Sequence, residues 1–207
     1  MCSADLDIIK NQDTVPVVAL ALGPTAGMGA ARTVASHYSI MVKGLSQIFA
    51  AGPAVAAAIG DDLSKEQLGG SDIHTTNGVV DEEVASEAEA FVTARKFLSY
   101  LPSNVNQLAA RTENWDPVDR KDESLLSAVP RADKQVYSMR KIMTSVFDEG
   151  SVFEMGKRWG RAAITALGRL ERSEERRVGE GGSSRGESWT QEEEAAGIRA
   201  RGIKVDG

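Results

Sequence analysis

The stretch that decides the fold runs from residue 15 to residue 37. It reads VPVVALAL over Val15–Leu22, then GPTAGMG over Gly23–Gly29, then AARTVASH over Ala30–His37. The first segment is continuously apolar and β-branched and does not alternate, which is typical of a strand covered on both faces in a parallel sheet. The order of strand, glycine-rich turn and short helix therefore predicts an α/β fold.

Further elements of both kinds follow along the chain. We expect strands at Tyr38–Val42, Gln47–Ala50 and Val79–Val80, and helices at Pro53–Ile59, Asp81–Tyr100 and Lys134–Phe147. A short helix is also expected within Asp61–Thr76, where Ser64 and Gln67 have the spacing of a capping box. The three consecutive acids Asp81–Glu83 favour the start of the long helix, because acidic side chains stabilise the positive end of a helix dipole.

The remaining segments are less regular. Ala4–Gln12 is expected to be the end of a helix, and Ser151–Leu170 either two short strands or a strand and a helix. Ser103–Asp133 is polar, contains proline and shows no period, which indicates a connection between domains or a functional excursion. Glu171–Gly207 is charged and rich in Gly and Ser, so disorder is its expected state.

The composition limits the possible partners. The 207 residues carry a formal net charge of −6, whereas non-specific nucleic-acid binding needs a basic face. The single cysteine, Cys2, excludes an internal disulfide and a cysteine-based metal cluster. No apolar run reaches the ~18–20 residues of a membrane span, and Asp5 and Asp7 stand where a signal peptide would be positive. We therefore expect a cytoplasmic protein with neither nucleic acid nor membrane as a partner.

The glycine-rich turn is the first candidate for chemistry. Amides at the start of a helix can hold a phosphate or stabilise an oxyanion. The dinucleotide-binding pattern fails, because Gly27 and Gly29 are not followed by the third glycine and no acid ends the strand Tyr38–Val42. The phosphate-loop pattern is absent as well. An oxyanion hole remains, beside the simpler interpretation that these glycines only let a strand turn tightly into a helix.

Other candidates carry weaker signals. His37 and His74 have no cysteine partners and no HExxH arrangement, so no metal site is expected, and His74 is either structural or a ligand contact. No G-x-S-x-G elbow is present. The run DPVDR at 116–120 predicts a local turn with surface charge pairs. Arg161 and Arg169, on an otherwise apolar segment, are expected to snorkel, to pair with carboxylates or to contact phosphate.

Several segments, in this order, resemble the carboxyltransferase (beta) subunit of biotin-dependent acyl-CoA carboxylases of the acetyl-/propionyl-CoA carboxylase type. The resemblance spans about Asp7 to Leu170. Its pieces are VPVVALALGPTAGMGAA, IMVKGLSQIFAAGP, LGGSDIHTTNGVVD, FLSYLP, DPVDR, and the run from Tyr137 through FDEGSVFEMGKRWGRAAITALGRL. Each piece is short, and the order and spacing of all of them carry the resemblance.

The resemblance implies a crotonase-like (ClpP/crotonase) α/β fold in two related halves, of which the first holds acyl-CoA and the second carboxybiotin. On that pattern, residues 1–101 are the C-terminal part of the acyl-CoA-binding domain and residues 102–133 the inter-domain connection. The long helix Asp81–Tyr100 and the irregular segment after it fit this helical connection to a second domain. Residues 134–170 begin the carboxybiotin-binding domain, and residues 171–207 are a low-complexity tail, disordered or artefactual. The implied partners are a coenzyme A thioester, a biotin carboxyl carrier or biotin carboxylase subunit, and further copies of the chain, since the family subunit is usually hexameric.

The resemblance also implies the site and its chemistry, which is carboxyl transfer from biotin to the α-carbon of a short acyl-CoA. The backbone amides of Gly27, Met28 and Gly29 would form an oxyanion hole for the thioester enolate. Substrate contacts would come from Ala26, Ala30, Gly69, Gly70 and His74. No side-chain base is expected, because in this family biotin itself is thought to take the α-proton.

Three departures from the family pattern shape the expectation. Many members carry two adjacent glycines where this chain has Gly27 and Met28, and the glycine motifs for the other side of the CoA site are missing upstream. Glu171–Gly182 replaces an apolar strand, which indicates a frameshift, a truncated reading frame or joined foreign sequence. We therefore expect an internal fragment that is inactive alone. The alternatives are a subunit of a biotin-dependent acyl-CoA decarboxylase and a non-catalytic interaction remnant.

Overall fold

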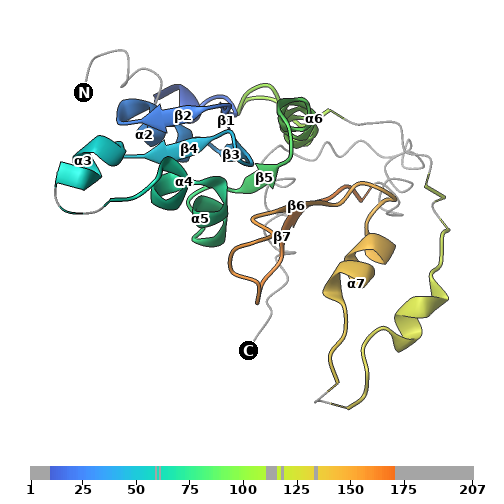
Figure 1. Cartoon of the computed structure of the whole chain (residues 1–207). Helices are drawn as coiled ribbons and strands as arrows, with labels where there is room; N and C mark the ends of the chain where they lie inside the picture. Colours follow the sequence, from blue (N-terminus) through green and yellow to red (C-terminus); the bar gives the residue numbers. More distant parts are fainter. Residues whose placement is uncertain are drawn as a thin grey trace.

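The computed structural model describes residues 10–58, 60, 62–110, 116–117, 119–132 and 135–170. Within them the chain forms a three-stranded sheet, a two-stranded parallel pair and a two-stranded antiparallel hairpin, with short helices around them (Figure 1). Residues 10–12 are helical, which is the described end of the helix expected at Ala4–Gln12. The tail Glu171–Gly207 lies outside the described residues.

The main sheet is parallel and has β3 at its centre. Its order is β1 (Val18–Ala21), β3 (Tyr38–Val42) and β5 (Glu82–Val84). All five residues of β3 are buried, because a strand flanks it on each side and side chains cover both faces. The predicted strands at Val15–Leu22 and Tyr38–Val42, and their parallel pairing, are confirmed.

A second parallel pair lies beside the main sheet. β2 (Pro24–Ala26) pairs with β4 (Gln47–Phe49), and only Gly27 separates β2 from α2 (Met28–Val34). The prediction of a continuous turn over Gly23–Gly29 is wrong in this respect. Pro and Ala have little preference for strands, so the extension of Pro24–Ala26 depends on its pairing with β4.

Three short helices follow β4, namely α3 (Pro53–Ala58), α4 (Lys65–Gly69) and α5 (Ser71–Thr76). The predicted capping box at the start of α4 is confirmed. The Ser64 side chain accepts from the Gln67 backbone N–H, and the Gln67 side chain accepts from the Ser64 backbone N–H. The sequence did not predict α5, because its Ser and Thr residues have no preference for a helix interior.

The long helix begins later than the sequence predicted. The acids expected at its start belong to β5 and the turn before it, and Val79–Val80 is not a strand. The helix itself, α6 (Glu87–Leu98), starts after Ser86, whose side chain accepts from the Glu89 N–H. Tertiary pairing overrides the charge preference here, because Asp81 accepts from both the N–H and the hydroxyl of Ser39, at 2.8 and 2.9 Å, beside the β3 ladder.

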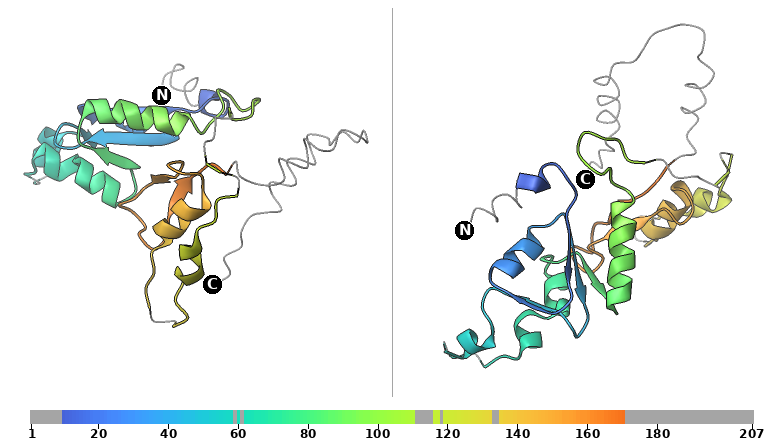
Figure 2. Two further views of the ribbon diagram at one scale, coloured as in Figure 1. Left: turned by 90° about the vertical axis from the view of Figure 1, so that its right-hand side faces the viewer. Right: turned by 90° about the horizontal axis from the view of Figure 1, so that it is seen from above.

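The last third contains a 3₁₀ turn, a helix and a hairpin. The turn η1 (Glu123–Ser127) and α7 (Met139–Val146) lie side by side and project away from the sheets (Figure 2). The helix predicted at Lys134–Phe147 is therefore confirmed only from Met139 onward. β6 (Phe153–Met155) and β7 (Thr165–Leu167) pair in antiparallel fashion, which confirms the two-strand alternative for Ser151–Leu170.

The hairpin shares its core with the main sheet. Phe153 on β6 is 7% exposed, and its ring centroid lies 5.6 Å from that of Tyr38 on β3 and 6.2 Å from that of Phe97 on α6. Tyr38 and Phe97 stack with their centroids 4.5 Å apart. The hairpin, predicted to begin a second domain, thus packs on elements from the first hundred residues.

Truncating this aromatic contact should destabilise the whole described fold. We predict that Phe153→Ala lowers the free energy of unfolding by about 3–5 kcal/mol, because it removes a buried ring and leaves a cavity between β3 and α6. The measurement is urea denaturation followed by circular dichroism. Phe91→Ala on α6 is the matched control, since Phe91 is 44% exposed. Equal losses for the two variants would contradict the placement of Phe153 in the core.

Candidate functional site

The glycine turn predicted to be catalytic lies where β2 passes into α2. Gly27 is the N-cap of α2, with φ 60° and ψ −125°, a backbone conformation that glycine adopts readily and side-chain-bearing residues rarely. β2 and β4 are parallel neighbours, so their carboxyl ends meet at this turn. Ligands in open α/β sheets bind at such carboxyl ends.

The three predicted amide donors are not equivalent. The Gly27 N–H donates to the Phe49 carbonyl of β4 at 3.2 Å, so this amide is occupied within the protein. Ala31 is the first residue to donate along the helix, to the Gly27 carbonyl at 3.1 Å. Met28 and Gly29 therefore carry first-turn amides that an α-helix cannot satisfy internally. These two N–H groups are the geometrically suitable donors of the predicted set.

The side chains around the turn divide into exposed and buried ones. Ala26 and Met28 are exposed, and Met28 retains 46% of its accessible surface. Ala30 is 6% exposed and packs with Ala21, Met41, Ile48 and Val80, so its side chain belongs to the core. Of the predicted contacts at this turn, only Ala26 and Met28 expose their side chains.

Gly69 and Gly70 lie where α4 meets β4. A Cβ on Gly69 would stand 2.0 Å from the Ile48 carbonyl oxygen, so only glycine lets the end of the helix approach the strand this closely. Gly70 forms an isolated bridge with Gln47, and a Cβ there would meet the Glu66 carboxylate at 2.5 Å. The structure thus gives both glycines a packing role next to the strand that carries the turn.

His74 on α5 reaches the same strand. Its Nε2 lies 2.6 Å from the Ile48 carbonyl oxygen, and because a carbonyl only accepts, Nε2 carries the proton. Nδ1 is buried and accepts no hydrogen bond from any described residue. His37 accepts the Val17 N–H at Nδ1, 3.1 Å away. Among the described residues no group of His, Cys, Asp and Glu side chains could hold a metal ion.

Two side chains near the site gave no sequence signal. The hydroxyl of Ser46 is fully buried, donates to the Ala21 carbonyl at 2.5 Å and accepts the Val42 N–H at 2.7 Å, and so joins the ends of β1 and β3. Arg158, in the β6–β7 connection, contacts Asp72 and Thr75 on α5 and Glu83 on β5. Isolated serines and arginines are too common in sequences for such roles to be recognised.

The predicted turn DPVDR has a more specific task than surface pairing. The Arg120 guanidinium pairs with Asp116 at 3.2 Å and donates to the carbonyls of Ser145 and Phe147, at 3.0 and 2.9 Å. These carbonyls lie at the C-terminal end of α7, where a cation is favourable. Arg169, by contrast, stacks over the Tyr100 ring at 4.5 Å and donates to the Ser99 carbonyl at 2.7 Å.

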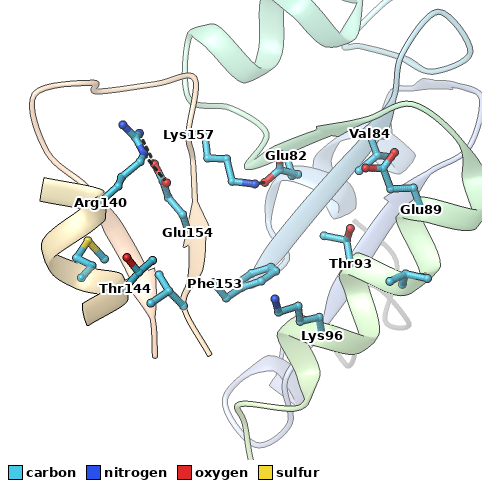
Figure 3. Close-up of a pocket in the computed structure, with 13 residues that line it drawn as sticks. Glu82, Val84, Glu89, Thr93, Lys96, Arg140, Thr144, Phe153, Glu154 and Lys157 are labelled. Atoms are coloured by element: carbon cyan, nitrogen blue, oxygen red, sulfur yellow. Dashed lines mark hydrogen bonds and ion pairs between the residues drawn. The ribbon is translucent and has the colours of Figure 1, made fainter. Parts of the chain in front are cut away.

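A cavity of about 390 Å³ separates α6 and β5 from α7 and β6 (Figure 3). Four of its charged side chains form two ion pairs, with Lys157 3.3 Å from Glu82 and Arg140 2.6 Å from Glu154. Burial raises the pKa of Glu82, and the hydrogen bond from Arg140 lowers the pKa of Glu154. None of the predicted site residues lines this cavity, which therefore remains separate from the glycine turn.

Comparison with known proteins establishes the family. Residues 6–179 match the carboxyl transferase domain. The chain therefore belongs to the carboxyl transferase domain family, as the resemblance in its sequence indicated.

Its relatives include enzymes with different names. The carboxyltransferase subunit of propionyl-CoA carboxylase from Haloferax mediterranei is 31% identical over 159 residues, which cover 76% of this chain and 31% of the relative. The mitochondrial propionyl-CoA carboxylase beta chain of Homo sapiens is 32% identical over 78% of this chain and 30% of its own length. The methylmalonyl-CoA decarboxylase subunit alpha of Veillonella parvula is 30% identical over 76% of this chain and 31% of its own length. The chain thus spans about a third of the length of the relatives it matches.

Solved structures agree with the fold. The transcarboxylase 12S structure with hydrolysed methylmalonyl-coenzyme A bound, described as a hexamer, superposes with a TM-score of 0.75 at 26% identity. The match covers 80% of this chain and 33% of the transcarboxylase chain. The predicted crotonase-like α/β fold is confirmed by this likeness. No helix in the described part of the chain has the length and apolar character needed to cross a membrane.

The close approach of α4 to β4 can be tested by adding one methyl group. We predict that Gly69→Ala lowers the free energy of unfolding by about 1–3 kcal/mol, because the new Cβ would force α4 away from Ile48. Gly52→Ala is the matched control, since its Cβ would meet only Phe49, at 3.6 Å. Chemical denaturation of both variants measures the difference. A Gly69→Ala protein as stable as Gly52→Ala would refute the assigned packing role.

Proposed function

We propose that this chain contributes acyl-CoA-binding elements of a carboxyltransferase that moves a carboxyl group from carboxybiotin to the α-carbon of a short acyl-CoA. The observation that carries the proposal is the pair of first-turn amides, Met28 and Gly29, at the joined carboxyl ends of β2 and β4. Membership of the carboxyl transferase domain family supports it. So do the propionyl-CoA carboxylase relatives and the methylmalonyl-coenzyme A described for transcarboxylase 12S.

The task of the turn follows from the charge that develops in the reaction. Loss of the α-proton places negative charge on the thioester oxygen, and two N–H groups held at a helix start stabilise that oxygen without having to reorganise. Carboxybiotin, carried on a partner protein, supplies the carboxyl group, and the family resemblance makes biotin the acceptor of the α-proton. The Gly27 amide, bonded to Phe49, fixes the turn and leaves the donation to its two neighbours.

The proposal includes the division of the chain inferred from the resemblance. Residues 1–101 are assigned to the acyl-CoA-binding domain, 102–133 to the connection and 134–170 to the start of the carboxybiotin-binding domain. The proposed partners are an acyl-CoA, a biotin carboxyl carrier or biotin carboxylase subunit, and further copies of the chain. Ala26, Ala30, Gly69, Gly70 and His74 are retained as residues around the substrate. Ala30, Gly69, Gly70 and His74 are engaged in packing contacts and hydrogen bonds within the protein. We propose that they contribute mainly by supporting the site.

The Veillonella parvula relative gives a second candidate function. Its name, methylmalonyl-CoA decarboxylase subunit alpha, indicates related chemistry that runs toward release of CO₂. The same amides would stabilise the same enolate in that direction, so the glycine turn serves both proposals. A methylmalonyl-CoA-dependent release of CO₂ by an assembled complex would favour the decarboxylase.

Binding at the two amides can be observed directly. We predict that titration of the ¹⁵N-labelled chain with propionyl-CoA shifts the amide resonances of Met28 and Gly29, because their N–H groups donate to the thioester oxygen. Met28→Pro removes one donor at the first helical position, where proline is tolerated, and should weaken binding about fivefold, as expected for one neutral hydrogen bond of about 1 kcal/mol.

The control for this prediction is Met28→Ala, which keeps the N–H and should bind within about twofold of the unsubstituted chain. The amide spectra of both variants report whether α2 remains folded. An unsubstituted chain whose Met28 and Gly29 resonances do not respond to millimolar propionyl-CoA would overturn the assignment. If such a chain still associated stably with a full-length carboxyltransferase subunit, a non-catalytic interaction role would replace the enzymatic one.

The chain alone should not complete the transfer. We predict no methylmalonyl-CoA-dependent carboxylation of free biotin by the purified chain, because it spans only about 31% of the relatives that carry the activity in their names. Mass spectrometry of the biotin product is the measurement. Carboxybiotin formation above that of a reaction without protein would show that these residues suffice for catalysis.

A further inference from the structure

The guanidinium of Arg158 joins segments that are far apart in the sequence. Its Nη1 lies 3.1 Å from both the Thr75 hydroxyl and Glu83 Oε1, and its Nη2 donates to the Asp72 carboxylate. Three acceptors from α5 and β5 thus surround one side chain from the β6–β7 connection. A planar fork of five donors fits such a set, whereas a lysine ammonium offers only a point charge.

The contacts of Arg158 continue into buried hydrogen bonds that hold α5 in place. The Thr75 hydroxyl, fully buried, donates to the Ser71 carbonyl at 2.7 Å. The Ser71 hydroxyl, 1% exposed, donates to Glu83 Oε2 at 2.6 Å. Among the described residues Glu83 forms a second ion pair, with Lys43, which lies 3.8 Å away and is 73% exposed. Arg158 is therefore the closer and better-shielded partner of this carboxylate.

β4 connects α5 to the glycine turn through two adjacent carbonyls. The Ile48 carbonyl accepts from His74 Nε2 on α5, at 2.6 Å. The next carbonyl, that of Phe49, accepts the Gly27 N–H at 3.2 Å and so sets where α2 begins. A displacement of α5 is therefore transmitted to the strand that fixes the turn, over two hydrogen bonds.

We infer that Arg158 is a positioning residue for the glycine turn, acting through α5 and β4 on the amides of Met28 and Gly29. The expected effect of Arg158 on substrate binding rests on the proposed function. The structural link from Arg158 through α5 and β4 to the turn does not. The link also connects the two proposed domains, because Arg158 belongs to the segment assigned to the carboxybiotin half and the turn to the acyl-CoA half.

The test compares Arg158→Gln with Arg161→Gln in the full chain. Both substitutions remove one positive charge from the same β6–β7 connection, but only Arg158 contacts α5 and β5, while Arg161 is exposed. Amide spectra of the ligand-free variants report the position of each element, and titration with propionyl-CoA reports affinity. Arg158→Lys is included in case the glutamine variant does not fold, since it keeps the charge and loses the fork.

The expected result has two parts. In the ligand-free Arg158→Gln spectrum the resonances of Ile48, Phe49, Met28 and Gly29 should move, in addition to those of α5. The affinity for propionyl-CoA should fall about fivefold or more, the lower end of typical coupling between sites. The affinity and the resonance shifts of Arg158→Lys should lie between those of Arg158→Gln and those of the unsubstituted chain. Arg161→Gln should give the affinity and the spectrum of the unsubstituted chain.

The result that overturns the inference is a change confined to α5 and β5, with the glycine-turn resonances and the affinity unchanged. That outcome would make Arg158 a purely local stabiliser. Absence of propionyl-CoA binding in the unsubstituted chain would instead count against the proposed function. The ligand-free spectra would then still decide whether the link from Arg158 to the turn exists.

Discussion

The hydrogen bond from the Gly27 N–H to the Phe49 carbonyl is the contact on which the candidate site depends. It ends the pairing of β2 with β4 and fixes the residue at which α2 starts. Because Gly27 takes a positive φ, the chain passes from β2 into the helix within one residue, and the next two amides belong to the first turn of α2. The amide of Gly27, which the family resemblance implied as an oxyanion donor, is therefore occupied within the protein and fixes the turn.

The sequence predicted the buried centre of the fold well and its edges poorly. Val15–Leu22 and Tyr38–Val42 are continuous apolar runs, and such runs have few stable alternatives to a covered strand. β2 and β5 have no such pattern. Pro24–Ala26 extends because β4 lies beside it, and Glu82–Val84 extends because β3 has a free edge there. Both strands depend on pairing with residues distant in the sequence, and local propensity carries no information about such pairing.

The residues of the candidate site lie close together in the structure, since the turn, the two glycines before α5 and His74 all contact β4. The division of tasks among these residues could not be predicted. Gly69 and Gly70 look the same as ligand-binding glycines in a sequence. Only the structure shows that a Cβ on Gly69 would stand 2.0 Å from the Ile48 carbonyl oxygen, so that this glycine serves close packing. Hydrogen-bond partners of single side chains such as Ser46 and Arg158 are likewise set by tertiary distances.

Two of the three acids that suggested a helix start, Glu82 and Glu83, form ion pairs with the β6–β7 connection. Adjacent residues of a strand point to opposite faces, so Glu82 and Glu83 lie on the two sides of β5. Glu82 faces Tyr38 and is met by Lys157, while Glu83 faces Ser71 and is met by Arg158. Two consecutive cations of one connection therefore reach around β5, which is an edge strand of the described sheet. The same contacts bind the hairpin to the sheet, because Lys157 and Arg158 join the β6–β7 connection to the two sides of one edge strand.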